Sequence, residues 1–497
     1  MSGSGRWPGQ SSCLHDNRRG RHDRRASDRP ATRRCGVRRM SLWDAIVIGA
    51  GPAGIGASSL LAENGAKVLV IDEAPGPGGQ IWRGVEDVSD ARARILGSDY
   101  LAGRDEVRRL RASGAELSFE TQAWRVEPEG TVWLKDSHGI RRERGRRLLI
   151  ATGAMERPCP LDGWTLPGVT TVGGLQILLK REGMLPGGPL VLIGTGPLFY
   201  LFAAQCLAAG MRDLSLIDTA AAGAIVSALR YVPAALTGKG PSYLIKGLKL
   251  LWMLRRAGVD IYNHSGDLRI KSAADGLEVH FRMREVEHRL SASHVGLHEG
   301  VIPETHLPRA LGCRMHWSEA GGAFHPHRDI DLQSSVAGVY IAGDAGGIGG
   351  ATVALLEGRL AAMGILTSLG RPIGELLLRA TRRDRAAHLA ARPLLDHLYH
   401  PSPAILTPAD GVLACRCEEV TCGEIRAALR AGCAGPNQVK AFLRCGMGPC
   451  QGRMCGMTLT SLAASTHDIS MGDAGFLTIR PPLRPISLGE VADLVEP

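Results

Sequence analysis

Residues 44–54 read Asp-Ala-Ile-Val-Ile-Gly-Ala-Gly-Pro-Ala-Gly, and this stretch decides the fold of the protein. Its first five residues predict a short strand, which runs into a G-x-G-x-x-G turn and a helix of small residues from Ile55 to Asn64. A second strand follows at 67–71 and ends in Asp72-Glu73. This order of strand, glycine turn, helix, strand and acid is typical of a dinucleotide-binding βαβ unit. The sequence therefore predicts an α/β fold with a Rossmann-like domain.

Each glycine of this turn has its own physical task. The first makes the tight turn, the second lets the backbone approach a pyrophosphate, and the third lets the helix pack closely on the strand. The pyrophosphate would rest on the helix N-terminus. An acid after the second strand can accept hydrogen bonds from ribose hydroxyls; Asp72 is the first candidate and Glu73 the neighbouring alternative. The residues predicted to bind the nucleotide are Gly49, Gly51, Pro52, Ala53, Gly54, Asp72 and Glu73.

Three further segments favour FAD over NAD. Residues 77–80 (Pro-Gly-Gly-Gln) resemble the flavin-contacting loop of flavoproteins with two dinucleotide folds. Residues 148–153 resemble the strand and turn that link their nucleotide domains, and residues 338–344 resemble their second flavin motif, whose aspartate binds the ribityl or phosphate part of FAD. The dithiol of disulfide-reductase flavoproteins is absent, since no Cys lies between Gly79 and Cys159. The resemblance adds these residues to the FAD site: Gly79, Gln80, Ala151, Thr152, Gly153, Gly343 and Asp344.

A second strand–turn–helix unit lies at 189–199, with the turn Gly194-Thr195-Gly196-Pro197-Leu198-Phe199. Its third glycine is replaced by Phe199, and Asp218 ends the next predicted strand. One interpretation is an NAD(P)H site. The other, which we favour, is a Rossmann-like half that no longer binds nicotinamide well, because the third glycine normally allows close helix–strand packing.

Seven of the twelve cysteines lie between residues 415 and 455. Four of them form a C-x-C…C-x4-C pattern that resembles the bacterioferritin-associated ferredoxin type of [2Fe–2S] domain: Cys415, Cys417, Cys450 and Cys455. A structural zinc is the alternative, although zinc sites usually use C-x2-C spacing. Cys445 is an alternative ligand to Cys450. Six histidines between His294 and His327 lack the H-E-x-x-H spacing, and we expect structural roles for them.

The charge of the chain argues against a nucleic-acid partner. Residues 1–39 hold eleven arginines and three aspartates, which is +8 of the net +10, so the remainder is close to neutral. We predict that residues 1–40 form a disordered basic tail, and we consider Met40 as a possible start of translation. The longest charge-free run, 183–211, is interrupted by glycine and proline, so we predict no transmembrane segment. We expect a cytoplasmic protein, with peripheral contact to the inner membrane through partners left open.

Together, these motifs resemble one flavoprotein family. It contains the A subunits of opine oxidases, the alpha subunits of dye-linked proline and hydroxyproline dehydrogenases, and the B subunits of hydrogen cyanide synthases. The resemblance also rests on 151–168 and 297–303. It implies an FAD-containing, electron-relaying subunit with a [2Fe–2S] cluster, acting on C–N bonds of an amino or imino acid (opine, proline, hydroxyproline or glycine). It further implies a flavoprotein beta subunit of the amino-acid-oxidase type and a downstream electron acceptor. A stand-alone NAD(P)H-dependent flavin reductase is the alternative function.

These observations predict two Rossmann-like domains, one inserted in the other, followed by a small helical Cys-rich domain. After the tail, the FAD domain comprises 41–155 and 300–385, and the second Rossmann-like domain comprises 156–299. A helical linker at 386–408, the [2Fe–2S] domain at 409–472 and a C-terminal segment at 473–497 complete the chain.

Overall fold

The first sheet is built around the strand that opens the glycine turn. The computed structural model describes residues 41–263 and 265–492, so the predicted tail lies outside the described residues. The buried strand β1 (Leu42–Ile48) pairs in parallel with β2 (Val68–Ile71) on one side and β6 (Gly139–Ile150) on the other. Four strands complete this seven-stranded sheet: β3 (Glu116–Ser118) beside β2, the antiparallel β5 (Thr131–Asp136) and β4 (Gln122–Val126), and β19 (Val339–Ile341), which is parallel to β6.

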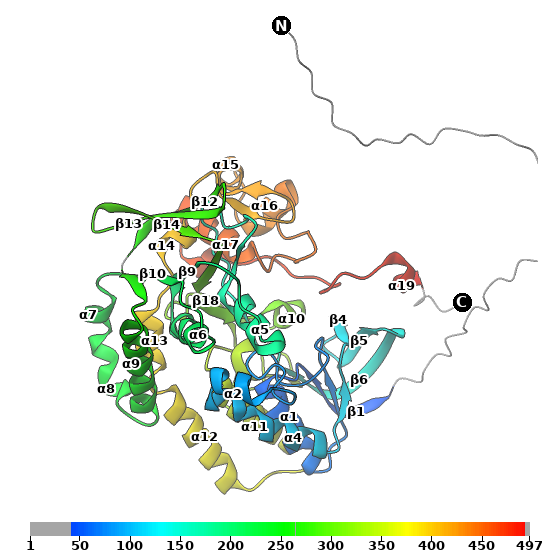
Figure 1. Cartoon of the computed structure of the whole chain (residues 1–497). Coiled ribbons are helices and arrows are strands. Elements are labelled where there is room, and N and C mark those ends of the chain that lie inside the picture. Colours follow the sequence, from blue (N-terminus) through cyan, green and yellow to red (C-terminus); the bar gives the residue numbers. More distant parts are fainter. Residues whose placement is uncertain (1–40, 264, 493–497) are drawn as a thin grey trace, which may run out of the picture. The chain divides into compact units, whose positions relative to one another are not determined.

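Two helices that start at the carboxyl edge of this sheet pack directly on each other. They are α1 (Pro52–Glu63) and α11 (Ala351–Ser368), which lie side by side in Figure 1. Their backbones meet because a Cβ on Gly358 would lie 1.9 Å from the carbonyl oxygen of Ala53. Among the described residues, α11 alone is long and apolar enough to cross a membrane, and 61% of it is buried inside the protein. Three more helices lie between β2 and β3: α2 (Asp90–Leu96), α3 (Ser98–Leu101) and α4 (Gly103–Ala112).

The second sheet is parallel throughout. Its order is β11 (Asp260–Asn263), β10 (Leu214–Asp218), β9 (Leu190–Thr195), β15 (His294–Glu299) and β8 (Val169–Thr171). Its helices are α5 (Val172–Glu182), α6 (Pro197–Ala208), α7 (Ala224–Ala228), η1 (Leu229–Tyr231), α8 (Val232–Ala235) and α9 (Gly240–Arg256). An antiparallel meander precedes β15: β12 (Gly266–Ala273), β13 (Gly276–Met283) and β14 (Val286–Ala292).

A short antiparallel pair marks where the chain leaves the first sheet and returns to it. The chain leaves through β7 (Ala154–Glu156) and returns through β16 (Val301–Pro303), which pairs with β7. Because these strands flank the second sheet in sequence, the second Rossmann-like unit is an insertion, as predicted. Between β16 and β19 lie α10 (His306–Ala310), β17 (Met315–Ser318) and β18 (Ala323–Pro326), and η2 (Gly343–Ala345) leads into α11.

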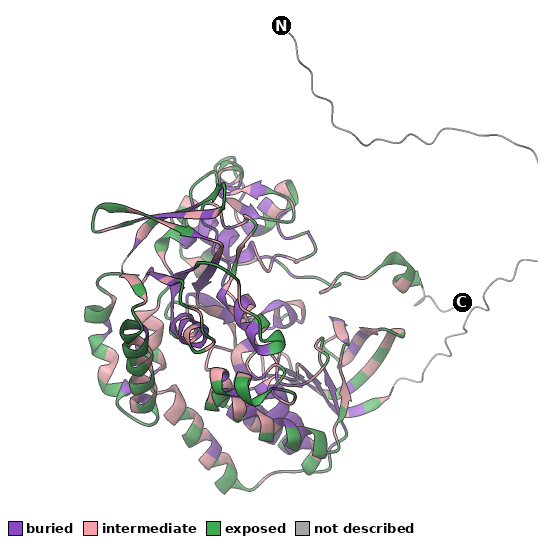
Figure 2. Cartoon of the chain, viewed as in Figure 1, coloured by how far each residue is buried: buried purple, intermediate pink, exposed green. Residues whose placement is uncertain are grey.

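The rest of the chain is mainly helical. A buried cluster joins it to the second sheet and the meander, and Figure 2 shows β9 and α17 (Gly456–His467) largely as buried. We keep the domain boundaries given above as a proposal. The elements are α12 (Glu375–Leu389), α13 (Arg392–Leu398), α14 (Pro403–Leu406), β20 (Leu413–Cys415), β21 (Val420–Thr421), α15 (Cys422–Arg430), α16 (Pro436–Leu443), α17 (Gly456–His467), α18 (Met471–Ala474) and α19 (Leu488–Ala492).

Candidate functional site

The first glycine turn has the close contacts that its sequence predicts. Gly49 has φ +110°, and a Cβ there would lie 2.3 Å from the carbonyl oxygen of Ala151. A Cβ on Gly54 would lie 1.8 Å from the carbonyl oxygen of Gly49. Helix α1 begins after Gly51 with Pro52 in its first turn and has no side-chain cap. Its N-terminal N–H groups are therefore available to an anionic ligand such as a pyrophosphate.

The predicted flavin loop lies directly over this turn. A Cβ on Gly79 would lie 2.9 Å from the Cα of Gly51, and the Gly78 N–H donates to the carbonyl oxygen of Ala50 at 2.8 Å. Lys180 of α5 also stabilises the loop, because its Nζ donates to the carbonyl oxygen of Gln80 at 3.0 Å. Burial and, to a smaller extent, the charge of Arg83 together lower the pKa of Lys180 to about 7. The fold thus places a buried amine against the loop expected to contact the flavin.

The two acids after β2 have different roles. Asp72 accepts from the backbone N–H of Ala50 at 2.6 Å and of Ala74 at 2.8 Å, one on each carboxylate oxygen. Burial raises the pKa of Asp72 although both hydrogen bonds oppose this rise. Asp72 therefore braces the glycine turn. The exposed carboxylate at this edge belongs to Glu73, which forms an ion pair with Arg484.

The second flavin motif also ends at a helix N-terminus without a side-chain cap. Oδ1 of Asp344 accepts from the N–H groups of Gly349 and Gly350 at 2.8 and 3.1 Å, and its Oδ2 has no hydrogen-bond partner among the described residues. Gly343 has φ +71°, and its N–H donates to the buried Glu357 at 2.9 Å. Burial raises the pKa of Asp344 despite the two hydrogen bonds from the glycines. Asp344 is thus fixed at the start of α11 with one oxygen left for a ligand.

This arrangement fits FAD. The uncapped N-termini of α1 and α11 both follow parallel strands of the first sheet, so they open on its carboxyl edge, where α/β proteins bind nucleotides. Ala151 donates its N–H to Ile48 at 2.8 Å and so continues the same edge, and the Gly153 carbonyl accepts from the Glu304 N–H at 3.0 Å. All predicted segments of the FAD site therefore meet at one edge of one sheet.

The second glycine turn differs from the first at its third position. Its first glycine makes the same close approach, since a Cβ on Gly194 would lie 1.7 Å from the carbonyl oxygen of His298, but Phe199 replaces the third glycine and is fully buried. Asp218, where a nucleotide ribose would be recognised, instead accepts from the hydroxyl of Tyr200 at 2.5 Å and from the Ala220 N–H at 2.9 Å. Asp218 therefore has a structural role, which agrees with the interpretation that this half no longer binds nicotinamide well.

Beside that turn lies a buried histidine–carboxylate pair. Nδ1 of His298 is 2.6 Å from Oε1 of Glu156, and the Glu156 carboxylate also accepts from the Gly173 N–H at the start of α5. A Cβ on Gly196 would lie 3.6 Å from Nε2 of His298. His298 thus packs against the second glycine turn and is held there by Glu156.

Five of the clustered cysteines converge in the C-terminal unit. Cys415 is hydrogen-bonded to Cys445 and Cys455, and Cys417 is hydrogen-bonded to Cys450. The hydrogen bonds from Cys445 and then Cys455 lower the pKa of Cys415 to about 2 against the effect of burial. In the described part of the chain, no three His, Cys, Asp or Glu side chains are arranged around a single metal position. The donor set suits a cluster bound by thiolates, and its four ligands remain a prediction.

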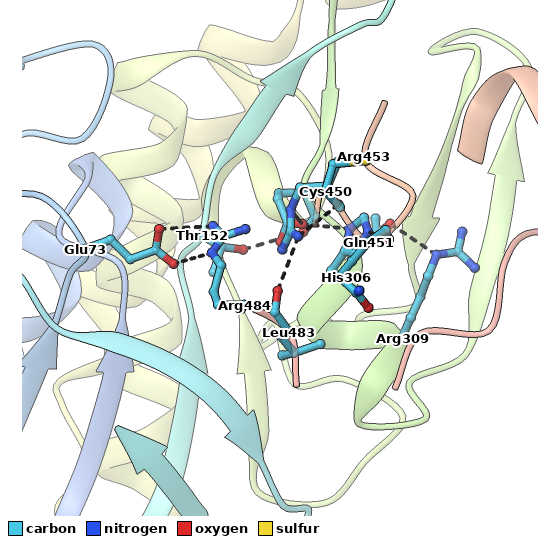
Figure 3. A network of polar contacts seen from close by, with 11 residues as sticks. Glu73, Thr152, His306, Arg309, Cys450, Gln451, Arg453, Leu483 and Arg484 are labelled. Carbon is cyan, nitrogen blue, oxygen red and sulfur yellow. Dashed lines mark hydrogen bonds and ion pairs between the residues drawn. The ribbon is translucent and has the colours of Figure 1, made fainter. Parts of the chain in front are cut away.

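Residues 446–453, which we call the cysteine turn, are joined to the flavin domain by largely buried charges (Figure 3). Arg453 donates to the carbonyl oxygen of Cys450 at 3.3 Å, and its Nε lies 3.3 Å from Oε1 of Glu304. His306 lies 2.8 Å from the same oxygen through Nδ1 and 2.8 Å from the Gln451 carbonyl through Nε2. Burial alone would raise the pKa of Glu304, but His306, Arg453 and Arg484 lower it to about 2. Glu304 is therefore an anion that ties the turn to the flavin domain.

Two further contacts extend this network to the predicted nucleotide site. The hydroxyl of Thr152 lies 3.5 Å from the carbonyl oxygen of Glu304, at the limit of a hydrogen bond. The Arg484 guanidinium contacts Glu73 at 2.6 and 3.1 Å, and the preceding Leu483 carbonyl accepts from Arg453 at 3.3 Å. In Figure 3, Arg484 and Arg453 lie between Glu73 and the cysteine turn. The C-terminal segment thus spans both predicted cofactor sites.

Sequence reasoning missed four residues of this network: Glu304, His306, Arg453 and Arg484. None belongs to a motif with a recognisable spacing, and the partners lie far apart, for example His306 and Gln451 at a separation of 145 residues. The only available signal was that Arg453 lies inside the cysteine pattern. Lys180 was missed as well, because nothing in the sequence marks a lysine whose ammonium group is buried.

Comparisons with known proteins place this geometry in a family. The pyridine nucleotide-disulphide oxidoreductase family model matches residues 43–358, and the sarcosine oxidase A3 domain model matches residues 415–494. The second match begins at Cys415 and runs past the boundary predicted at 472. There, Leu477 packs on the cysteine turn: a Cβ on Gly446 or Gly452 would lie 2.6 Å from its Cδ1.

Individual relatives agree with these matches. The opine oxidase A subunit of Rhizobium meliloti is 99% identical over 458 residues, which cover 92% of this chain and 100% of that protein. The HcnB subunit of hydrogen cyanide synthase from Pseudomonas protegens is 31% identical over 90% of this chain and 97% of that protein. The crystal structure of L-proline dehydrogenase from P. horikoshii shares the fold, with a TM-score of 0.66 and 18% identity over 91% of this chain and 80% of that one. The chain therefore belongs to the pyridine nucleotide-disulphide oxidoreductase family, within the group formed by the opine oxidase A subunits and the HcnB subunits of hydrogen cyanide synthase.

Proposed function

We propose that this chain is the FAD-containing, electron-relaying subunit of a hetero-oligomeric dehydrogenase that oxidises the C–N bond of an opine or a related amino or imino acid. The substrate class is taken from the name of the 99% identical relative, the A subunit of opine oxidase. The partner would be a flavoprotein beta subunit of the amino-acid-oxidase type, and a separate acceptor would take the electrons onward. Because clustered free thiols persist in reducing compartments, the proposal places the complex in the cytoplasm.

Two groups of residues would hold the cofactors. The N-termini of α1 and α11, Asp344 and the 77–80 loop would bind FAD, and Cys415, Cys417, Cys450 and Cys455 would bind a [2Fe–2S] cluster. When bound, FAD supplies a hydride acceptor and the cluster a one-electron carrier. The protein's own residues position and shield these groups: Gly49 and Gly79 allow close approach, Asp72 braces the turn, and Lys180 supports the flavin loop.

One observation carries the relay proposal. The turn that holds Cys450 is tied through Arg453 to Glu304, and Glu304 is in turn linked to Thr152 and Gly153 of the predicted flavin site. A contact of this kind keeps two redox sites at a fixed separation. The stand-alone NAD(P)H reductase finds no support, since Asp218 is engaged by Tyr200 and Ala220.

The test uses the complex purified anaerobically with its partner chain. We expect one FAD in this chain, about two iron and two acid-labile sulfide atoms per chain, and reduction of an artificial dye by an opine. Proline, hydroxyproline, glycine and sarcosine serve as competing substrates in the same assay. Zinc in place of iron would contradict the cluster, and failure of every amino or imino acid to reduce the dye would contradict the function.

Alanine variants assign the ligands. Cys450→Ala should remove the iron and its EPR signal, whereas Cys445→Ala and Cys433→Ala should retain them. Cys433 is a matched control because it is buried in the same unit but has no bond to the other cysteines. Loss of iron in Cys445→Ala with retention in Cys450→Ala would exchange the two assignments.

A further inference from the structure

The helices that follow β10 carry large apolar side chains on their outer side. We define the apolar face as six residues that are 59–72% exposed and lie in α7, η1 or α9 or directly after α8: Ile225, Val226, Leu229, Leu236, Leu248 and Trp252. Figures 1 and 2 show α7, α8 and α9 together at one margin of the described residues, coloured mainly as exposed or intermediate. Exposed apolar side chains gathered on neighbouring helices indicate an interaction site.

These side chains are not needed for the core beneath them. On α7 and α8 the fully buried residues are small: Ala228 and Ala235 pack in one cluster with Ala391 and Leu394. Ile225 and Leu229 stand four residues apart and are therefore on one face of the helix, turned toward solvent. An amphipathic helix of a globular protein normally places its large apolar residues inward, so this arrangement indicates a ligand on the outside.

The segment that carries the apolar face is basic. Between Asp218 and Asp260 the chain has no Asp or Glu, but it has six bases: Arg230, Lys239, Lys246, Lys249, Arg255 and Arg256. Arg256 lies over the ring of Trp252, 5.2 Å from its centroid. Lys246 forms an ion pair with Asp99 of α3, the acid that faces this surface from the neighbouring elements. A tryptophan and leucines between lysines and arginines are the composition of helices that lie in a membrane interface.

We propose that the apolar face and its bases dock this chain on the surface of an anionic lipid bilayer. The apolar stretch Ala224–Ala235 is too short to cross, since twelve helical residues span about 18 Å of a hydrocarbon core of about 30 Å. Three lysines and three arginines lie in the segment that carries this face, and their charge complements that of anionic headgroups. Apolar insertion and attraction to anionic headgroups therefore act together, and the inference does not depend on the proposed function.

The experiment measures co-sedimentation of the full chain with vesicles. Vesicles of phosphatidylglycerol and phosphatidylcholine should bind the chain at least tenfold better than pure phosphatidylcholine, and 0.5 M salt should weaken this binding. The triple variant Leu229→Glu, Leu248→Glu, Trp252→Glu should lose at least tenfold in binding. The control Ile330→Glu, Leu376→Glu changes equally exposed apolar residues elsewhere and should bind within twofold of the unchanged chain.

A second measurement reports insertion. Brominated lipids should quench part of the tryptophan fluorescence, and Trp252→Phe should bind vesicles as before while losing that quenching. Three results would overturn the proposal. They are no vesicle binding, equal binding by the triple variant (which would place the contact in the arginine-rich residues 1–39 that both chains keep), and a triple variant that loses a partner chain while vesicle binding is unchanged.

Discussion

At the scale of single residues, Lys180 gives the sharpest prediction. Its pKa is about 7 in the folded protein against 10.5 in an unfolded chain, so between these values the unfolded chain binds the additional proton. Stability therefore rises with pH across this window, by at most about 1.4 kcal/mol per pH unit from this group. Denaturation by urea between pH 7.5 and 9.5 should show a flatter rise for Lys180→Met than for the exposed control Lys271→Met. Parallel profiles would contradict the burial of a neutral amine.

Gly448 leaves the space that the side chain of Cys417 occupies. A Cβ there would lie 2.3 Å from the Cβ of Cys417, so Gly448→Ala should displace that thiol at a cost of about 1–3 kcal/mol. We expect the iron content of the chain to fall, and with it the visible absorbance of the proposed [2Fe–2S] cluster. Gly411→Ala is the matched control, because nothing lies within 4 Å of a Cβ at that position. Equal iron content in both variants would contradict the expected displacement of the Cys417 thiol.

At the scale of elements, Glu357 of α11 holds three segments together. Its buried carboxylate accepts from Arg328 at 2.7 Å, from Arg385 at 2.6 Å and from the Gly343 N–H at 2.9 Å. Glu357→Gln removes the negative charge that faces Arg328 and Arg385. The free energy of unfolding, measured by urea denaturation, should fall by about 3–5 kcal/mol. FAD should also dissociate more readily, as measured by flavin release. Glu375→Gln of α12 breaks an exposed pair with Arg379 and should change stability by about 0–1 kcal/mol.

The second glycine turn yields a prediction at the same scale. Because Phe199 replaces the third glycine of the turn and Tyr200 engages Asp218, anaerobic NADH or NADPH should leave the flavin oxidised. Dithionite, as the control, should bleach it. Rapid bleaching by either nucleotide would mean that this half opens to bind one.

For the molecule as a whole, the bridge between the two predicted cofactor sites can be cut at Arg453. Arg453→Met removes the contacts to Glu304 and to the Cys450 carbonyl, and we expect substrate to produce the cluster EPR signal at least tenfold more slowly, with FAD and iron contents retained. Arg453→Lys should restore part of the rate through its charge. Arg444→Met, which breaks a more exposed pair with Glu418 beside the same turn, should match the unchanged chain. Equal rates in the two methionine variants would refute the bridge.

Local patterns in the sequence were enough for the fold class. The strand, glycine turn, helix and acid at 44–73 lie next to one another in the chain, so their spacing alone defines a βαβ unit. The same holds for the inserted second unit, where Phe199 in place of glycine already indicated a changed turn. The order of the FAD segments was equally legible, because each is a short motif of glycines and one acid.

The tertiary structure decided what those motifs touch. It assigned Asp72 to the glycine turn and left Glu73 exposed to meet Arg484, a residue 411 positions away. It also brought Glu304, His306 and Arg453 together and turned Leu248 and Trp252 outward. The physical reason is range: turns and helix starts depend on neighbours in sequence, whereas buried ion pairs and exposed faces depend on how distant segments pack.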